Sequence, residues 1–286
     1  MVDLTTSLAG LRLAHPFIAG ASPLGRNLDA IRRLEDGGCA AIVLPSLFEE
    51  QISKATEGRI RHRHVFDSVS PDWMPHFPSE DDYAFSPTEY VEHVQKARAA
   101  VQIPIIASLN RTTAEAWLKF AKTLEQAGAH ALELNMYDAV VNIRQQGSSL
   151  EYQLFQIASD LKRLLKIPVA IKLSPFFTSF GNVASRLDQI GVDGLVLFNR
   201  FYQSDIDIEQ MFSVVDVRLS SNDELVLRLR WISALFGRLR ASLVLSGGVA
   251  APEDGIKAIL AGAHAVQVVS AVRRHGPNHS VHSSTV

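Results

Sequence analysis

The sequence has almost none of the features that would tie it to a disulfide framework, a zinc site or a membrane. Cys39 is the single cysteine among 286 residues, so the chain can form neither an internal disulfide nor a cysteine-based zinc site. No apolar run reaches the roughly 18 residues needed to span a bilayer. Residues 1–5 also lack the basic and then apolar pattern of a signal peptide. We therefore expect a cytoplasmic protein without a membrane partner.

The chain also lacks an excess of either charge. It carries 28 Lys and Arg against 30 Asp and Glu, for a net charge of -2, and its pI is near 6.6. A nucleic-acid partner would call for a basic surface, and the composition indicates none. With 47% hydrophobic and 20% charged residues, the composition is that of a globular protein. It excludes a disordered, collagen-like or coiled-coil chain.

What the sequence does contain is a repeat. Four times, the predicted end of a helix starts with a leucine and is followed by a glycine and then by a short apolar run. Glycine suits the end of a helix because it adopts the left-handed conformation at little steric cost. The glycines are Gly38, Gly128, Gly191 and Gly262, and the apolar runs span 41–44, 131–134, 194–197 and 265–268.

A second pattern alternates with the first. Ile103-Pro104 and Ile167-Pro168 each end a helical segment and open an apolar run, because the residue before a proline leaves the helical conformation. With two further apolar runs, the patterns predict eight strands, at 17–21, 40–44, 104–108, 131–135, 168–173, 194–198, 242–246 and 264–269. Amphipathic helices are predicted between them, including 28–34, 114–124, 150–165, 225–236 and 251–260.

This alternation predicts the fold. Apolar strands separated by amphipathic helices indicate a parallel sheet covered by helices. Eight such units in 286 residues predict an α/β protein with a (β/α)8 TIM barrel, forming a single domain over residues 1–286. A doubly wound open sheet is the alternative, but no G-x-G-x-x-G follows the first strand to favour it. A long insertion is expected at 48–86, after the second strand, and residues 201–223 also interrupt the alternation.

The end of the chain is short for this fold. The eighth strand is expected to end near Val269, and the polar stretch at 274–286 has no apolar face. We therefore predict that the final helix of the barrel is missing or truncated, and that 274–286 is a disordered or extended tail. Apolar barrel surface left uncovered in this way would favour association.

Functional residues of a barrel gather where its strands end, and polar residues stand there. Lys172 lies in the apolar run Ala170-Ile171-Lys172-Leu173, where a buried ammonium without a partner would be costly. It needs an anionic or electron-rich ligand, or an ion pair with Glu133 on the neighbouring strand. Asn135 and Asn199 end the fourth and sixth strands. Their amides could bind the edge of a heterocycle or merely tie loops together.

A phosphate site is indicated after the last two strands. Gly247-Gly248 follows the seventh strand, and Ser270 follows the eighth. Glycines at such a position let backbone N–H groups approach a phosphate, and these two loops form the usual phosphate site of the fold. The histidines are scattered, so no metal site is expected. Cys39 is expected to be a buried and inert thiol.

Taken in order, these motifs resemble the class 1 dihydroorotate dehydrogenases, which are FMN-containing TIM barrels. The resemblance begins at His15-Pro16-Phe17-Ile18 and Ala21-Ser22 and continues to about residue 276. The other matching motifs are Glu133-Leu134-Asn135, Ala170-Ile171-Lys172-Leu173, Phe198-Asn199, Ser246-Gly247-Gly248-Val249 and Val266-Gln267-Val268-Val269-Ser270. The resemblance implies an FMN-dependent oxidoreductase that acts on a CH–CH bond of a small cyclic substrate, and it points to pyrimidine biosynthesis.

The resemblance also implies roles for individual residues around the flavin. Lys172 would contact the ring near N1 and O2, where a positive charge stabilises the reduced anionic form. Asn135 and Asn199 would lie between the flavin and the substrate, and Ala21 and Ser22 would lie along the flavin.

The same resemblance implies how the phosphate would be held. Backbone N–H groups of the two loops named above would bind it, and two serines stand where the family has a glycine pair near the cofactor. The loop residues are Gly247, Gly248, Val269 and Ser270, and the serines are Ser220 and Ser221.

The substrate half of the site departs from the family. The family has a cysteine general base a few residues after the fourth-strand asparagine, whereas this chain has Asp138 at that place. Asp138 could act as the base, since a carboxylate can take that role, and Tyr137 could donate a proton. The lysine that normally ends the second strand is missing, and the stretch reads Val43-Leu44-Pro45-Ser46.

The sequence leaves three functions open. The favoured one is an FMN-dependent oxidoreductase with Lys172 and Asp138 as its catalytic residues. The second is a flavin-binding partner or electron-transfer protein without dihydroorotate turnover. The third is a lyase or isomerase acting on a phosphorylated substrate, with Lys172 as a Schiff-base lysine. The expected partners are a small-molecule substrate and either a second copy in a homodimer or a redox partner subunit.

Overall fold

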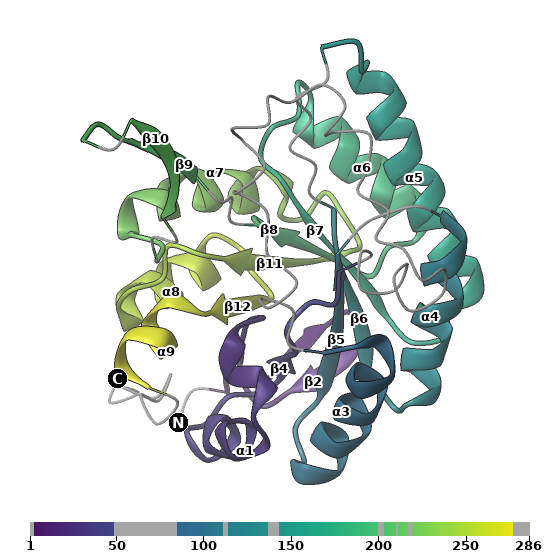
Figure 1. The fold of residues 1–286 in the computed structure, drawn as a ribbon, viewed down its shortest axis with the longest axis vertical. Coiled ribbons are helices and arrows are strands. Elements are labelled where there is room, and N and C mark those ends of the chain that lie inside the picture. Colours follow the sequence, from purple (N-terminus) through teal and green to yellow (C-terminus); the bar gives the residue numbers. More distant parts are fainter. Residues whose placement is uncertain are drawn as a thin grey trace.

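The protein is a closed barrel of parallel strands. A computed structural model describes residues 3–48, 85–110, 114–136, 143–199, 203–209, 211–216 and 219–276. In it, eight parallel strands close into a barrel in the order β11-β12-β3-β4-β5-β6-β7-β8. Helices surround the barrel on its outside (Figure 1). The predicted TIM barrel is confirmed.

The strands and helices lie where the repeat predicts them. The barrel strands are β3 (Phe17–Ala19), β4 (Ile42–Val43), β5 (Ile105–Asn110), β6 (Ala131–Asn135), β7 (Val169–Leu173), β8 (Gly194–Leu197), β11 (Ser242–Ser246) and β12 (Ala265–Val268). The helices are α1 (Leu28–Asp36), α3 (Pro87–Ala100), α4 (Ala114–Gln126), α5 (Gly147–Leu164), α6 (Phe180–Ile190), α7 (Leu225–Leu235), α8 (Pro252–Leu260) and α9 (Ser270–His275), with short 3-10 turns η1 (Pro23–Arg26) and η5 (Asn222–Glu224).

A hairpin that the patterns did not predict closes the amino-terminal end of the barrel. It consists of β1 (Thr6–Leu8) and β2 (Leu11–Leu13), which pair antiparallel. Leu8 and Leu13 are buried with apolar side chains of the barrel interior. At the turn, the backbone N–H of Ala9 donates to Ser242 Oγ at 2.9 Å. The hairpin therefore forms the floor of the barrel, so that a site can open only at the other end.

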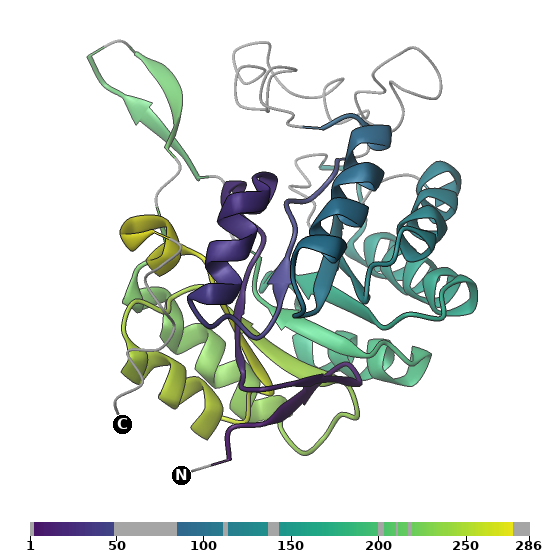
Figure 2. The same cartoon turned by 90° about the horizontal axis from the view of Figure 1, so that it is seen from below.

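A second hairpin lies in the segment that interrupts the alternation. Strands β9 (Gln203–Asp207) and β10 (Phe212–Asp216) pair antiparallel. Figure 2 shows this hairpin projecting from the end of the molecule opposite to β1 and β2. The sequence predicted an interruption here, and the structure shows that it forms an arm beside the open end of the barrel.

The described part of the chain ends with a short helix. The helix after the eighth strand, α9, has six residues and ends at His275, two residues into the stretch that was expected to be a tail. The remainder of the predicted tail, 277–286, lies outside the described residues, as does most of the predicted insertion, 49–84. Within the described parts of the chain, no helix is both long and apolar enough to cross a bilayer.

The repeat places a hydrogen-bonding side chain at the same point of several units. Nδ1 of His130 accepts the backbone N–H of Ile105 at 3.0 Å, and the N–H of His130 donates to the Ile105 carbonyl at 2.9 Å. His264 makes the same two bonds to Leu243, at 3.1 and 2.8 Å. Asp193 holds this position before β8. Each side chain therefore ties the start of one strand to the residue that precedes the next strand.

We expect the free energy of unfolding to fall as the pH drops from about 7.5 to about 5. Burial lowers the pKa of His130 and of His264 below the ordinary value of 6.5. Burial also lowers the pKa of His93, whose Nε2 lies 2.6 Å from the Gly25 carbonyl. The unfolded chain therefore binds protons first, so the stabilisation is present above 6.5 and is lost as the pH falls through the folded-state values. Urea denaturation across this range measures the effect.

The variant His130→Asn/His264→Asn is the matched control for this prediction. An asparagine oxygen can accept the same backbone N–H, but it does not titrate. The double variant should lose part of the pH dependence while keeping its stability near neutral pH. A pH dependence equal to that of the wild type would show that these two histidines do not cause it.

Candidate active site

Polar side chains line the barrel where its strands approach the open end. The strand register places Ser108 beside Glu133 and Asn135 beside Lys172. All four side chains are buried. Alternate residues of a strand point to the same face, so Glu133 and Lys172 follow the small inner residues Ala131 and Ala170 on that face. The barrel interior thus changes from apolar near its floor to polar near its mouth.

Lys172 is engaged by two side chains inside the barrel. Its Nζ donates to Gln267 Oε1 at 3.0 Å and lies 3.5 Å from Glu133 Oε1. The Gln267 amide in turn donates to Glu133 Oε2. The ion pair that the sequence offered as one explanation of Lys172 is therefore present. The three residues come from β7, β6 and β12, so they tie opposite sides of the barrel together.

A neutral cluster lies next to this triangle. Nδ2 of Asn135 donates to Ser46 Oγ at 2.8 Å and to Ser108 Oγ at 3.1 Å, and the two hydroxyl oxygens are 2.7 Å apart. Tyr90 of α3 fixes the cluster from outside, because its hydroxyl accepts the N–H of Ser108 at 3.0 Å and donates to its carbonyl at 3.1 Å. Burial raises the pKa of Tyr90, which keeps this hydroxyl protonated and able to donate.

The loop after β11 requires glycine at two successive positions. Gly247 and Gly248 have φ values of 89° and 82°, in the left-handed region that glycine adopts readily. A Cβ on Gly248 would lie 2.7 Å from the backbone nitrogen of Leu225, and one on Gly247 would lie 2.9 Å from Arg228 Nη2. The loop therefore packs directly against the start of α7, and a residue without a side chain is needed at both positions.

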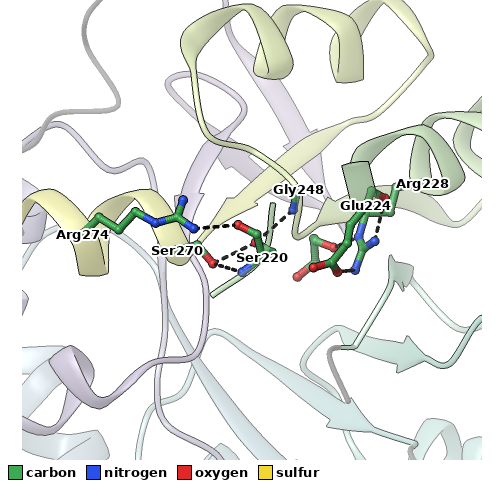
Figure 3. A network of polar contacts seen from close by, with 7 residues as sticks. Ser220, Glu224, Arg228, Gly248, Ser270 and Arg274 are labelled. Carbon is green, nitrogen blue, oxygen red and sulfur yellow. Dashed lines mark hydrogen bonds and ion pairs between the residues drawn. The ribbon is translucent and has the colours of Figure 1, made fainter. Parts of the chain in front are cut away.

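Three loops meet at this glycine pair (Figure 3). The N–H of Gly248 donates to Ser220 Oγ at 3.1 Å, and the hydroxyl oxygens of Ser220 and Ser270 are 2.8 Å apart. The N–H of Ser220 also donates to Ser270 Oγ at 2.9 Å. Arg274 of α9 completes the network, because its Nη2 donates to the Ser220 carbonyl at 3.1 Å. The structure thus brings Gly248 and Ser270, which were predicted for the phosphate, together with Ser220, which was predicted near the cofactor.

A buried arginine supports the same loop from α7. Arg228 is 5% exposed, and its Nε donates to the carbonyl of Ser246, the last residue of β11. Its other nitrogens contact Glu224, with 2.7 Å to the carbonyl and 3.1 Å to Oε2. An arginine at this position places positive charge beside the glycine pair. Such charge is favourable for a bound phosphate.

Comparison with known proteins identifies the family. The model of the family described as dihydroorotate dehydrogenase matches residues 84–283. The chain belongs to the dihydroorotate dehydrogenase family. It is 28% identical over 282 residues to a putative dihydroorotate dehydrogenase A (fumarate) of Aeropyrum pernix, with 96% of this chain and 88% of that protein covered.

Two further relatives carry a related name. The chain is 27% identical over 285 residues to the catalytic subunit of dihydroorotate dehydrogenase B (NAD(+)) of Thermoplasma volcanium, covering 96% of this chain and 89% of that protein. It is 25% identical over 284 residues to the subunit of the same name from Methanocaldococcus jannaschii, covering 96% and 88%. The predicted resemblance is confirmed, together with the prediction of an enzyme of the dihydroorotate dehydrogenase type.

The remaining residues predicted for the family's cofactor site follow barrel strands, except for Ser221. Ala21 and Ser22 follow β3, and Ser22 precedes η1. Asn199 follows β8, and its backbone N–H is bonded to the end of β7. Ser221 is exposed before η5, and Val269 precedes α9. Their contacts to a cofactor stay predictions.

The predicted catalytic base could not be placed. Asp138 and its neighbour Tyr137 lie outside the described residues, so the role of Asp138 stays a prediction. In the described part of the chain, no group of three or more His, Cys, Asp or Glu side chains is arranged to hold a metal ion. Cys39 is buried, and burial raises its pKa to about 11. The expected burial of this thiol is confirmed.

The structure also shows site residues that the sequence patterns did not single out. Gln267 contacts both members of the buried ion pair, and Arg228 and Arg274 support the glycine loop. Two of these three residues could have been identified from the sequence. Gln267 is a polar residue in an apolar strand, as Lys172 is, and Arg228 stands among the apolar residues at 225–229.

Proposed function

We propose that the chain is an FMN-dependent oxidoreductase that oxidises or reduces a CH–CH bond of a small cyclic substrate. The observation that carries the proposal is the position of two features at the same end of the barrel. Lys172 is buried near the end of β7, and the Gly247–Gly248 loop follows β11. A cofactor with a ring at one end and a phosphate at the other needs a site of each kind.

The residues present fit FMN at both ends. For the phosphate, the glycine pair, Ser220 and Ser270 come together at the loop after β11, and Arg228 adds positive charge beside them. Val269 and Ser270 would contribute further N–H groups at the start of α9. For the ring, Lys172 and Asn135 lie on adjacent strands in register. When bound, FMN supplies the two-electron acceptor that no amino-acid side chain provides.

The residues of the chain would supply the rest of the chemistry. Lys172 presents a positive charge, and Asn135 is held in one orientation by the hydroxyls of Ser46 and Ser108. Asp138 would take the proton from the substrate carbon on a carboxylate oxygen, as a general base. Because the stretch after β4 contains Ser46 and lacks the family's lysine, the substrate would meet hydroxyl groups at that place.

The alternative of a Schiff-base lyase is less well supported. A lysine that forms a Schiff base must be an uncharged amine with a free lone pair. Lys172 is instead paired with Glu133 and donates to Gln267. The nitrogen of Lys172 is thus already engaged by two side chains.

The names of the relatives support a partner. Two of them are catalytic subunits of an NAD(+)-dependent enzyme, and a catalytic subunit works with at least one other subunit. We therefore include an electron-transfer subunit as a proposed partner of this chain, acting in the cytoplasm. A homodimer stays a prediction.

The visible spectrum of the purified protein tests the proposal. We expect a flavin band, or saturable uptake of added FMN that produces one, followed by bleaching when dihydroorotate is added without oxygen. Absence of the band together with absence of FMN uptake would refute flavin binding. A flavin band that dihydroorotate does not bleach would instead favour a different substrate or the electron-transfer role.

A further inference from the structure

A carboxylate is buried beside the lysine that would face the cofactor. The side chains of Lys172 and Glu133 are 8% and 2% exposed, and Lys172 Nζ lies 3.5 Å from Glu133 Oε1. Among the described residues, that oxygen accepts no hydrogen bond. Its interaction is therefore with the ammonium charge, and the other oxygen of the carboxylate accepts from Gln267.

Gln267 determines how the pair is arranged. Its carbonyl oxygen accepts from Lys172 at 3.0 Å, while its amide nitrogen donates to Glu133. An amide has one accepting and one donating end, so it satisfies a cation and an anion at the same time only in this orientation. The three side chains therefore form a closed triangle in which Lys172 keeps one position.

The carboxylate also offsets the cost of burying a charge on Lys172. Burial disfavours the charged form of a lysine, whereas an opposite charge within about 4–6 Å favours it. Without Glu133, the amine would be buried with the neutral Gln267 as its remaining partner among the described residues. Removal of one member of a buried ion pair leaves the other uncompensated. An amine in that position releases its proton more readily.

We propose that Glu133 is a positioning residue that keeps Lys172 protonated and fixed at the barrel mouth, and that it thereby sets the midpoint potential of the bound flavin. This inference rests on the proposed FMN binding. A charged Lys172 stabilises the reduced anionic flavin relative to the oxidised one. Glu133 acts on that equilibrium through Lys172, without touching the cofactor itself.

The midpoint potential of the FMN-loaded protein tests the proposal. In Glu133→Gln, which preserves shape and removes charge, Lys172 becomes neutral and the midpoint falls. We expect about a tenfold loss of preference for reduced over oxidised FMN, which is about 30 mV for a two-electron couple. Lys172→Met should show a similar fall, and Lys172→Met/Glu133→Gln no further fall. Additive shifts, an unchanged midpoint or a rise in Glu133→Gln would overturn the proposal.

Two further variants keep the test decisive. Glu92→Gln removes an exposed glutamate that pairs with Lys96 on α3, and it should leave the midpoint unchanged. If Glu133→Gln does not fold, Glu133→Asp lengthens the ion pair by about one methylene. We expect it to shift the midpoint in the same direction by a smaller amount. No shift in that variant would overturn the proposal in the same way.

A measurement without cofactor separates this inference from the proposed function. Carbon-13 NMR of labelled lysine side chains reports whether Lys172 is charged in the ligand-free protein, and Lys172→Met assigns its signal. At about pH 8, we expect a charged amine in the wild type and a neutral amine in Glu133→Gln. If the protein takes up no FMN, the proposed function fails and this measurement still applies. Equal charge in both proteins would overturn the inference alone.

Discussion

Replacement of Gly248 by alanine should abolish FMN uptake and lower the free energy of unfolding by about 3 kcal/mol. Gly248 has a φ of 82°, which costs a residue with a Cβ roughly 1–2 kcal/mol. The new Cβ would also lie 2.7 Å from the nitrogen and 2.8 Å from the Cα of Leu225. These are backbone atoms at the start of α7, so no flexible side chain can move aside. The loop must shift, and the backbone that would face the phosphate shifts with it.

The chain offers a matched control for this prediction. Gly181 lies in α6, and a Cβ there would meet nothing within 4 Å. Gly181→Ala should therefore keep FMN uptake unchanged and raise stability by up to about 1 kcal/mol, because alanine favours a helix more than glycine does. Urea denaturation and a spectroscopic FMN titration measure the two effects separately. If Gly248→Ala binds FMN as the wild type does, the glycine loop is not the phosphate site.

The barrel strands could be predicted because their signals are local. A glycine at a helix end followed by a short apolar run identifies each unit by itself, as at Gly191 and residues 194–197. Helix α3 has an equally local signal, since Ser86 and Glu89 form a capping box at its start. The patterns indicated a helical segment before Ile103-Pro104, but its start was not predicted because it adjoins the long insertion, where the alternation of patterns is interrupted.

The floor hairpin illustrates what a local pattern cannot give. Leu8 and Leu13 are two apolar residues in a short stretch, and their burial depends on a barrel that the rest of the chain builds. The arm formed by β9 and β10 is a similar case. Among the described residues, its two strands pair with each other and not with the barrel, so the repeat that predicts the barrel strands does not predict them.

The candidate site likewise contains residues that the sequence alone could identify and residues that it could not. Lys172 was identified because a charge in an apolar strand needs a partner, and Glu133 on the next strand was a candidate for that partner. The cluster of Ser46, Ser108 and Asn135 joins the ends of three strands. Its hydrogen bonds depend on the register between neighbouring strands, which the spacing of residues in the sequence does not determine. Gln267 completes the triangle across the barrel for the same reason.

The repeat also contains an acidic residue whose role only the structure shows. Glu35, Glu125 and Asp188 follow the leucine near the end of three helices. In each case one carboxylate oxygen accepts two successive backbone N–H groups from the segment that enters the second barrel strand after the helix. The pairs are Gln102 and Ile103 at 2.7 and 3.1 Å, Lys166 and Ile167 at 2.5 and 3.0 Å, and Arg240 and Ala241 at 2.8 Å each.

Replacement of Glu125 by alanine should lower the free energy of unfolding by about 2 kcal/mol, because it removes two hydrogen bonds to a charged acceptor. The side chain of Glu125 is 12% exposed and also pairs with Lys122, so the carboxylate is well enclosed. Glu125→Gln retains one accepting oxygen without charge and should cost about half as much. As a control, Glu92→Ala removes an exposed pair on α3 and should change stability by less than about 0.5 kcal/mol. Urea denaturation near neutral pH measures all three.

The stabilisation by the Glu125 carboxylate should depend on pH, and the direction of that dependence follows from the pKa of the carboxyl group. Burial alone would raise the pKa of Glu125, but hydrogen bonds from Lys122 and from the N–H groups of Ile167 and Lys166 outweigh it. The pKa is therefore below the ordinary value of 4.5. Stabilisation by a group with a lowered pKa is complete above the unfolded value and is lost as the pH falls through the folded one. The difference in stability between wild type and Glu125→Ala should thus be constant near neutral pH and shrink below about pH 4.5. A difference that stays the same in acid would show that the charge of Glu125 does not stabilise the fold.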